Sequence, residues 1–133
     1  MKSIAAVFIL FLILSFNISG KEMMMAPDRI VPFTDMEDAR MQAESGPVVL
    51  FFFADWCPTC RLEMRDLESR VTELGNITVF IVDYDNSKKL KREYGVTYQH
   101  TFVQIDSRGK SLGLWNGGGL EGILNHIVRG EMN

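Results

Sequence analysis

The sequence predicts an α/β domain in which a central mixed sheet, made of a parallel core and an antiparallel hairpin, is covered by helices on both faces. Two observations lead to this fold class. From residue 30 onward, short apolar runs alternate with segments of helical periodicity, as in strand–helix–strand units. Near the C-terminal end, two strand-like runs flank the turn residues 106–109, which favours a hairpin. With 133 residues, the chain has room for one such domain.

The first elements of the domain are two strands with a helix between them. Residues 30–33 are a short strand candidate. Thr34 and Glu37 match a capping box, so a helix should begin there and run to about Ser45, before a helix-breaking Gly-Pro pair. Residues 48–53 are apolar without alternation. Such a run is typical of a central strand that is buried on both faces.

A second helix is expected after the cysteines. It should carry its apolar residues on one face and end at Gly75. These residues recur at helical spacing: Cys60, Met64, Leu67, Val71 and Leu74. The spacing predicts that Cys60 points inward and that Cys57, at the start of the helix, is exposed. The remaining predicted elements are a strand at 77–82, a short polar helix at 86–94, hairpin strands at 101–105 and 110–115, and a final helix at 120–128.

The chain contains two cysteines, Cys57 and Cys60, where the strand 48–53 is followed by a helix. Backbone N–H groups at a helix N-terminus are unpaired and the helix dipole adds partial positive charge, so this place favours a thiolate. Pro58 stiffens the turn and removes an N–H donor, while Thr59 adds an uncharged hydroxyl. A purely structural disulfide is the alternative, but closing a loop of about four residues contributes only about 2 kcal/mol. The pattern therefore indicates a two-thiol redox site.

The N-terminal segment differs in composition from the rest of the chain. Lys2 precedes an apolar run over residues 4–16, which is shorter than the roughly 20 residues that span a bilayer. Residues 1–20 are therefore predicted to be a secretory signal peptide, with an uncleaved N-terminal membrane anchor as the alternative. We expect residues 21–29 to be a flexible lead-in and residues 30–133 to form the α/β domain. We expect an extracytoplasmic protein, in the periplasm or outside the cell, that contacts a membrane only if residues 1–20 stay uncleaved and anchor it.

Over residues 30–128, the chain resembles thioredoxin. The strand 48–53 followed by Ala-Asp-Trp-Cys-Pro-Thr-Cys-Arg is similar to the family's active-site segment, including Trp56 before the first cysteine. Three later segments also resemble the family: 79–85, 94–96 and 110–117. The active-site segment is further similar to the periplasmic thioredoxin-like domain of transmembrane thiol-disulfide reductases. The resemblance implies the thioredoxin fold and a thiol-disulfide oxidoreductase that needs no cofactor.

The resemblance also implies roles for individual residues. Cys57 would be the nucleophile and Cys60 the resolving cysteine of a redox-active Cys57–Cys60 disulfide. Trp56 and the loop from Tyr98 to Thr101 would form the rim on which a partner protein lies. The implied partners are proteins with disulfides, as substrates, and a membrane-embedded reductase, as electron donor; the chain is expected to act as a monomer. No histidine lies between the cysteines, which favours a reductase over the alternative, a thiol oxidase.

Two positions depart from the family pattern. His100 stands where the family has a cis-proline beside the cysteines, and a cis bond before a non-proline residue costs about 2.5–4 kcal/mol, so a trans bond is expected. An imidazole at this place would influence the dithiol or bind a metal, unless it faces solvent. Phe51 stands where the family has a buried acid that helps to deprotonate the inner cysteine, and Ile81 where a buried lysine is common.

The same residues allow a second function class. A metal or iron–sulfur module could use Cys57, Cys60 and His100, although a four-ligand zinc site needs one more ligand. His126 in the final helix is expected to serve packing at the surface or at the helix end. The net charge is −3 with acidic and basic residues interleaved, so nucleic-acid binding is not expected.

Overall fold

The computed structural model of the protein describes residues 28–130. The predicted signal peptide or anchor at residues 1–20 lies outside the described residues, as does most of the lead-in at 21–29. Within residues 28–130, no helix has both the length and the apolar character needed to cross a bilayer.

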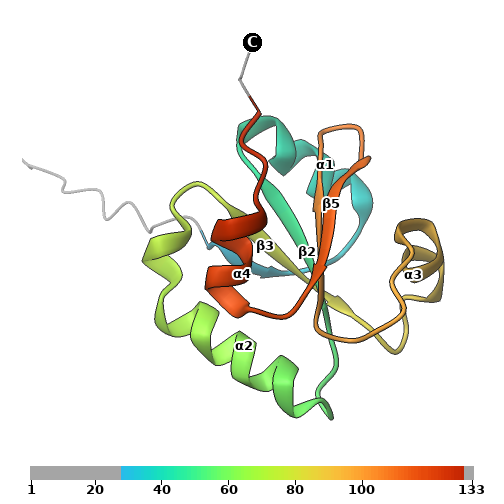
Figure 1. Ribbon diagram of the computed structural model, residues 1–133. Helices are drawn as coiled ribbons and strands as arrows, with labels where there is room; N and C mark the ends of the chain where they lie inside the picture. The colour runs from blue at the N-terminus through green and yellow to red at the C-terminus, as the bar shows by residue number, and fades with distance from the viewer. Residues whose placement is uncertain (1–27, 131–133) are drawn as a thin grey trace, which may run out of the picture.

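A mixed sheet forms the centre of the domain, with helices packed around it (Figure 1). It has five strands in the order β1-β3-β2-β4-β5. The strands are β1 (Ile30–Pro32), β2 (Val48–Phe53), β3 (Thr78–Asp83), β4 (Thr101–Ile105) and β5 (Ser111–Asn116). β1, β3 and β2 run parallel, whereas β4 is antiparallel to β2 and pairs with β5 as a hairpin. The predicted parallel core with an antiparallel hairpin at one side is therefore confirmed.

Helices cover both faces of this sheet, as expected. The helices are α1 (Met36–Ser45), α2 (Pro58–Ser69), the 3-10 helix η1 (Val71–Leu74), α3 (Lys88–Tyr94) and α4 (Gly119–His126). Leu50 and Phe52 of β2 pack on the side of α1 and α3, while Val49 and Phe51 pack on the side of α2 and α4. The apolar run of β2 lacks alternation because both of its faces lie in a core.

The start of α1 differs from the predicted capping box at Thr34. The residue that caps the helix is Asp35, whose side chain accepts a hydrogen bond of 2.9 Å from the N–H of Asp38. Phe33 still donates its N–H to a carbonyl of β3, so the chain leaves the sheet too late for Thr34 to cap the helix. Asp35 has extended backbone, as an N-cap residue requires.

The helix that follows the cysteines is also shorter than predicted. α2 ends at Ser69 because Arg70 leaves the helical backbone, with φ of −123°, and the chain continues as η1. The apolar face nevertheless persists across this break, since Leu67 and Leu74 are both buried. The periodicity therefore predicted the buried face correctly but not the end of the helix.

The chain turns at Gly117 and Gly118 between β5 and α4, and we call this turn the corner after β5. Gly122 of α4 packs against this corner. A Cβ atom at this position would lie 2.5 Å from the carbonyl oxygen of Gly117 and 3.3 Å from Nε1 of Trp115. Helix propensity alone predicts that Gly122→Ala stabilises the protein by about 1 kcal/mol. Because the backbone contact forces α4 away from the corner, we instead expect a loss of about 1–3 kcal/mol in the free energy of unfolding, measured with urea.

Gly113 in β5 provides the control for this prediction. A Cβ there meets no atom within 4 Å, so Gly113→Ala should leave the free energy of unfolding unchanged or raise it slightly. A Gly122→Ala protein as stable as the parent would show that α4 does not pack on the corner as closely as the structure has it.

Candidate active site

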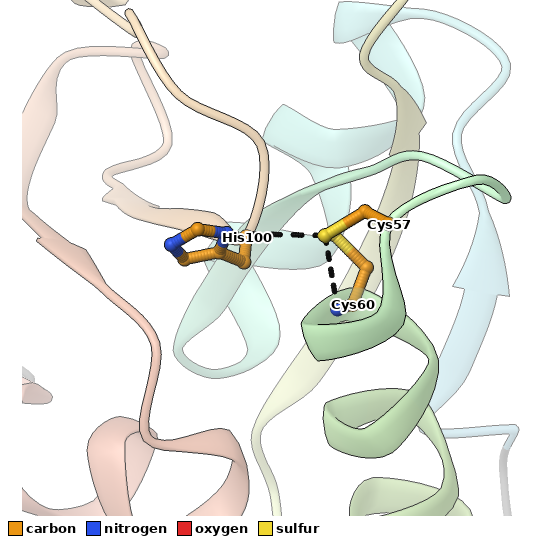
Figure 2. Close-up of side chains that lie close together, drawn as sticks. All are labelled: Cys57, Cys60 and His100. Carbon is orange, nitrogen blue, oxygen red and sulfur yellow. Dashed lines mark hydrogen bonds between the residues drawn. The ribbon is translucent and has the colours of Figure 1, made fainter.

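Cys57 and Cys60 lie at the N-terminal end of α2, directly after β2 (Figure 2). Cys57 is the N-cap residue and Pro58 occupies the first turn of the helix. The N–H of Cys57 donates to the carbonyl oxygen of Ala54 over 3.1 Å, which holds the turn. The Sγ atom of Cys57 accepts the N–H of Cys60 at 3.3 Å. The sulfur thus satisfies an N–H group that would otherwise be unpaired at the helix N-terminus.

The predicted exposure of Cys57 is wrong. Cys57 is only 2% exposed. Cys60 is fully buried, as predicted. Both are free thiols in this structure. Helical periodicity describes only the faces of α2 and therefore predicted an exposed Cys57. In the structure, the loop before β4 brings His100 to the sulfur of Cys57. Access to the sulfur of Cys57 therefore depends on this loop.

The two thiols differ in chemistry. Burial is the main cause that raises the pKa of the Cys60 thiol, and the hydrogen bond with Cys57 raises it further. Backbone hydrogen bonds from Ala54 and His100 lower this pKa in part. Cys60 therefore keeps its proton at neutral pH and is a poor nucleophile before an intermediate forms. Cys60 thus matches the buried, protonated thiol that the sequence predicts at this position.

His100 faces the dithiol directly, as Figure 2 shows, with its Nδ1 atom 4.0 Å from Sγ of Cys57. Its φ is 51°, the only positive value at a non-glycine position in residues 28–130, and all peptide bonds there are trans, as expected for this site. The N–H of His100 donates to the carbonyl of Phe52, and its own carbonyl accepts the N–H of Gly117. These bonds to β2 and to the corner after β5 hold the ring beside the sulfur.

Trp56 and Tyr98, two residues of the predicted rim for a partner protein, are exposed aromatic residues. Their exposed fractions are 56% and 64%, and Pro58 and Thr59 beside them are exposed too. The indole N–H of Trp56 donates to Asp85 over 2.9 Å. Asp85 was missed from the sequence, although its place just beyond a strand parallel to β2 was the available signal, since parallel strands end at the same edge of a sheet.

Thr101 does not lie on this rim, contrary to the prediction. It is 1% exposed, and its hydroxyl donates to the carbonyl of Tyr98 at 2.6 Å and accepts from the side chain of Asn116 at 2.7 Å. Both hydrogen-bonding capacities are thus used inside the protein because Thr101 already belongs to β4. Its role is to brace the loop that carries His100.

Phe51 is fully buried, so the core position under the dithiol is apolar, as the sequence indicated. Its ring stacks on that of Phe102, with ring centroids 4.3 Å apart. The buried carboxyl on this side of the sheet comes instead from Glu63, which follows Cys60 by one turn of α2 and is 7% exposed.

Glu63 does not stand out in the sequence, because the apolar pattern of α2 is made by apolar residues alone. Its carboxyl interacts with the backbone N–H groups of Gly118 and Gly119, and its Oε2 atom has no hydrogen-bond partner within residues 28–130. Burial raises the pKa of Glu63 to about 7. The signal available was its spacing of three from Cys60, which places both side chains on the same face of the helix. Near neutral pH this carboxyl is therefore poised between its two protonation states.

Cys57, Cys60 and His100 are also the residues that could hold a metal ion, since their ligand atoms all lie within 4.8 Å of one another. The second histidine is not part of this group. His126 stacks on Trp115 with ring centroids 5.1 Å apart and bonds to the carbonyl of Gly122, so its predicted packing role is confirmed.

Comparison with known proteins gives consistent similarities. Residues 24–110 match the AhpC/TSA family. Thioredoxin of Chlamydia trachomatis is 31% identical over 74 residues, which are 56% of this chain and 72% of that protein. The X-ray structure of Fasciola hepatica thioredoxin aligns with a TM-score of 0.59 and 28% identity, over 73% of this chain and 92% of that one. Thioredoxin from Trypanosoma brucei brucei aligns with a TM-score of 0.59 and 29% identity, over 71% and 83% of the two chains.

Proposed function

This chain belongs to the thioredoxin family, and we propose that it reduces protein disulfides outside the cytoplasm through the Cys57/Cys60 dithiol. One observation carries the proposal: Sγ of Cys57 caps α2 and accepts the N–H of Cys60, while the thiol of Cys60 lies buried behind it. A stabilised nucleophile with a protonated neighbour is the arrangement that two-step disulfide exchange requires.

The reaction begins when the thiolate of Cys57 attacks one sulfur of a substrate disulfide. The substrate S–S bond breaks, one substrate sulfur leaves as a thiolate, and a mixed disulfide forms on Cys57. Cys60 then attacks Sγ of Cys57 and releases the second substrate sulfur, and its proton passes to a departing substrate thiolate. The substrate gains two electrons and the chain ends with a Cys57–Cys60 disulfide.

The exposed rim of Trp56 and Tyr98 supports a protein substrate, because large aromatic side chains beside the thiols offer apolar area to an extended partner chain. The hydrogen bond from Trp56 to Asp85 keeps one side of the rim in place. The signal-like composition of residues 1–20 supports an extracytoplasmic site of action, where a membrane-embedded reductase would have to supply electrons.

The direction of the reaction is tested by the reduction potential of the dithiol. We expect the full-length chain, equilibrated with glutathione or dithiothreitol buffers, to give a potential near about −270 mV, as thioredoxin does. It should also accelerate insulin reduction by dithiothreitol. A potential near about −120 mV would contradict the reductase and support the thiol oxidase.

A further inference from the structure

Three potential metal-ligand atoms lie close together in the active site, although they come from two separate segments of the chain. Cys57 and Cys60 come from the start of α2, and His100 comes from the loop before β4 (Figure 2). Their sulfur and nitrogen atoms all lie within 4.8 Å of one another, and Nδ1 of His100 lies 4.0 Å from Sγ of Cys57. First-row metals make bonds of about 2.0–2.3 Å to imidazole and thiolate, so three donors in a plane around one ion lie about 3.5–4 Å apart. The arrangement thus needs only a small contraction to enclose an ion.

The donor set determines which ion fits. Two thiolates and an imidazole are soft ligands, which select Cu(I) or Zn(II) and disfavour Mg²⁺ and Ca²⁺. Zn(II) in proteins takes four ligands, whereas this group supplies three. Three ligands suffice for Cu(I), which accepts a trigonal arrangement. We propose that the reduced protein binds one Cu(I) ion through Cys57, Cys60 and His100.

The three donors are held in place without an ion. His100 has φ of 51° and is tied at its N–H to β2 and at its carbonyl to the corner after β5, so the backbone itself directs the ring toward the thiols. Cys57 is fixed as the N-cap of α2, and Cys60 is buried in the core. A site that is organised before binding loses little conformational entropy when the ion arrives.

Binding has a direct consequence for the proposed disulfide exchange, whose dithiol it uses. Each thiol that coordinates the ion releases its proton, and no oxidation state changes. Both sulfurs are then occupied, so Cys57 cannot attack a disulfide while Cu(I) is bound. The ion would therefore inhibit the reductase reversibly.

Anaerobic titration of the reduced full-length chain with Cu(I), in competition with bathocuproine disulfonate, tests the proposal. We expect one tightly held ion per chain, and a loss in affinity of at least about tenfold in His100→Ala, since losing even an outer-shell partner of a metal ligand costs about that much. His126→Ala serves as the matched control, because this histidine packs on Trp115 and should leave the affinity unchanged. X-ray absorption should show two Cu–S bonds and one Cu–N bond.

The methionines at 23–25 carry thioethers, which also bind Cu(I), so a variant with all three replaced by leucine is needed. It should keep the tightly held ion. An affinity in His100→Ala equal to that of the parent, or preferential uptake of Zn(II), would overturn the proposal. Insulin reduction measured without metal separates the two functions: a chain that reduces insulin but does not bind Cu(I) refutes the metal site and leaves the reductase intact.

Discussion

Cys57→Ser and Cys60→Ser are expected to abolish insulin reduction in different ways. Without the sulfur of Cys57 no attack occurs, so turnover should fall on the order of 10³-fold or more, as when other enzymes lose their nucleophile. Without Cys60 the first step still proceeds, since Cys57 keeps its place at the N-cap, but the mixed disulfide is not resolved. Cys60→Ser should therefore accumulate a covalent complex with the substrate.

The covalent complex is measured by non-reducing electrophoresis and by mass spectrometry of the linked peptides. In Cys60→Ser, the substrate should be linked to Cys57 in every complex. Cys57→Ser should trap no covalent complex. Thr59→Ser is the control for the motif, because Thr59 is exposed and its hydroxyl is retained, and it should reduce insulin at the parent rate. Substrate trapped on Cys60 in Cys57→Ser would mean that the roles of the two sulfurs are reversed.

Glu63→Gln is expected to stabilise the protein above pH 7 and to remove part of its pH dependence. Burial raises the pKa of this carboxyl from 4.5 to about 7. Below pH 4.5 the carboxyl is protonated in both the folded and the unfolded chain and has no pH-dependent effect. As the pH rises from 4.5 to 7, the unfolded chain ionises first, so the folded state loses stability, by about 3 kcal/mol in total. Glutamine is uncharged and avoids this loss.

Urea denaturation of the parent and Glu63→Gln at several pH values between 4.5 and 8 measures the effect. The difference in the free energy of unfolding should grow with pH in favour of Glu63→Gln and level off above pH 7. Glu68→Gln is the matched control, since Glu68 lies on the same helix but is exposed, and its difference should stay within about 0.5 kcal/mol. A difference for Glu63→Gln that does not change with pH would show that the carboxyl is solvated.

Much of the architecture was predictable because local patterns encode it. The apolar run 48–53 identified the central strand, since a strand covered on both faces has no polar positions to alternate with. The hairpin around 106–109 followed from turn residues between two strand-like runs. The two cysteines were located at a helix start because the strand before them and the periodicity after them are visible in the chain. Element ends were less predictable, as at Thr34, where hydrogen bonds to a distant strand shift the helix start.

The features that the sequence could not reveal all arise from contacts between distant segments. Cys57 is buried rather than exposed because His100, which follows it by 43 positions, approaches its sulfur. Glu63 acquires its high pKa only when the glycine corner and the core close around it. Helical periodicity says which face of a helix turns inward, but burial and protonation depend on what covers that face, and this is determined only when the elements pack together.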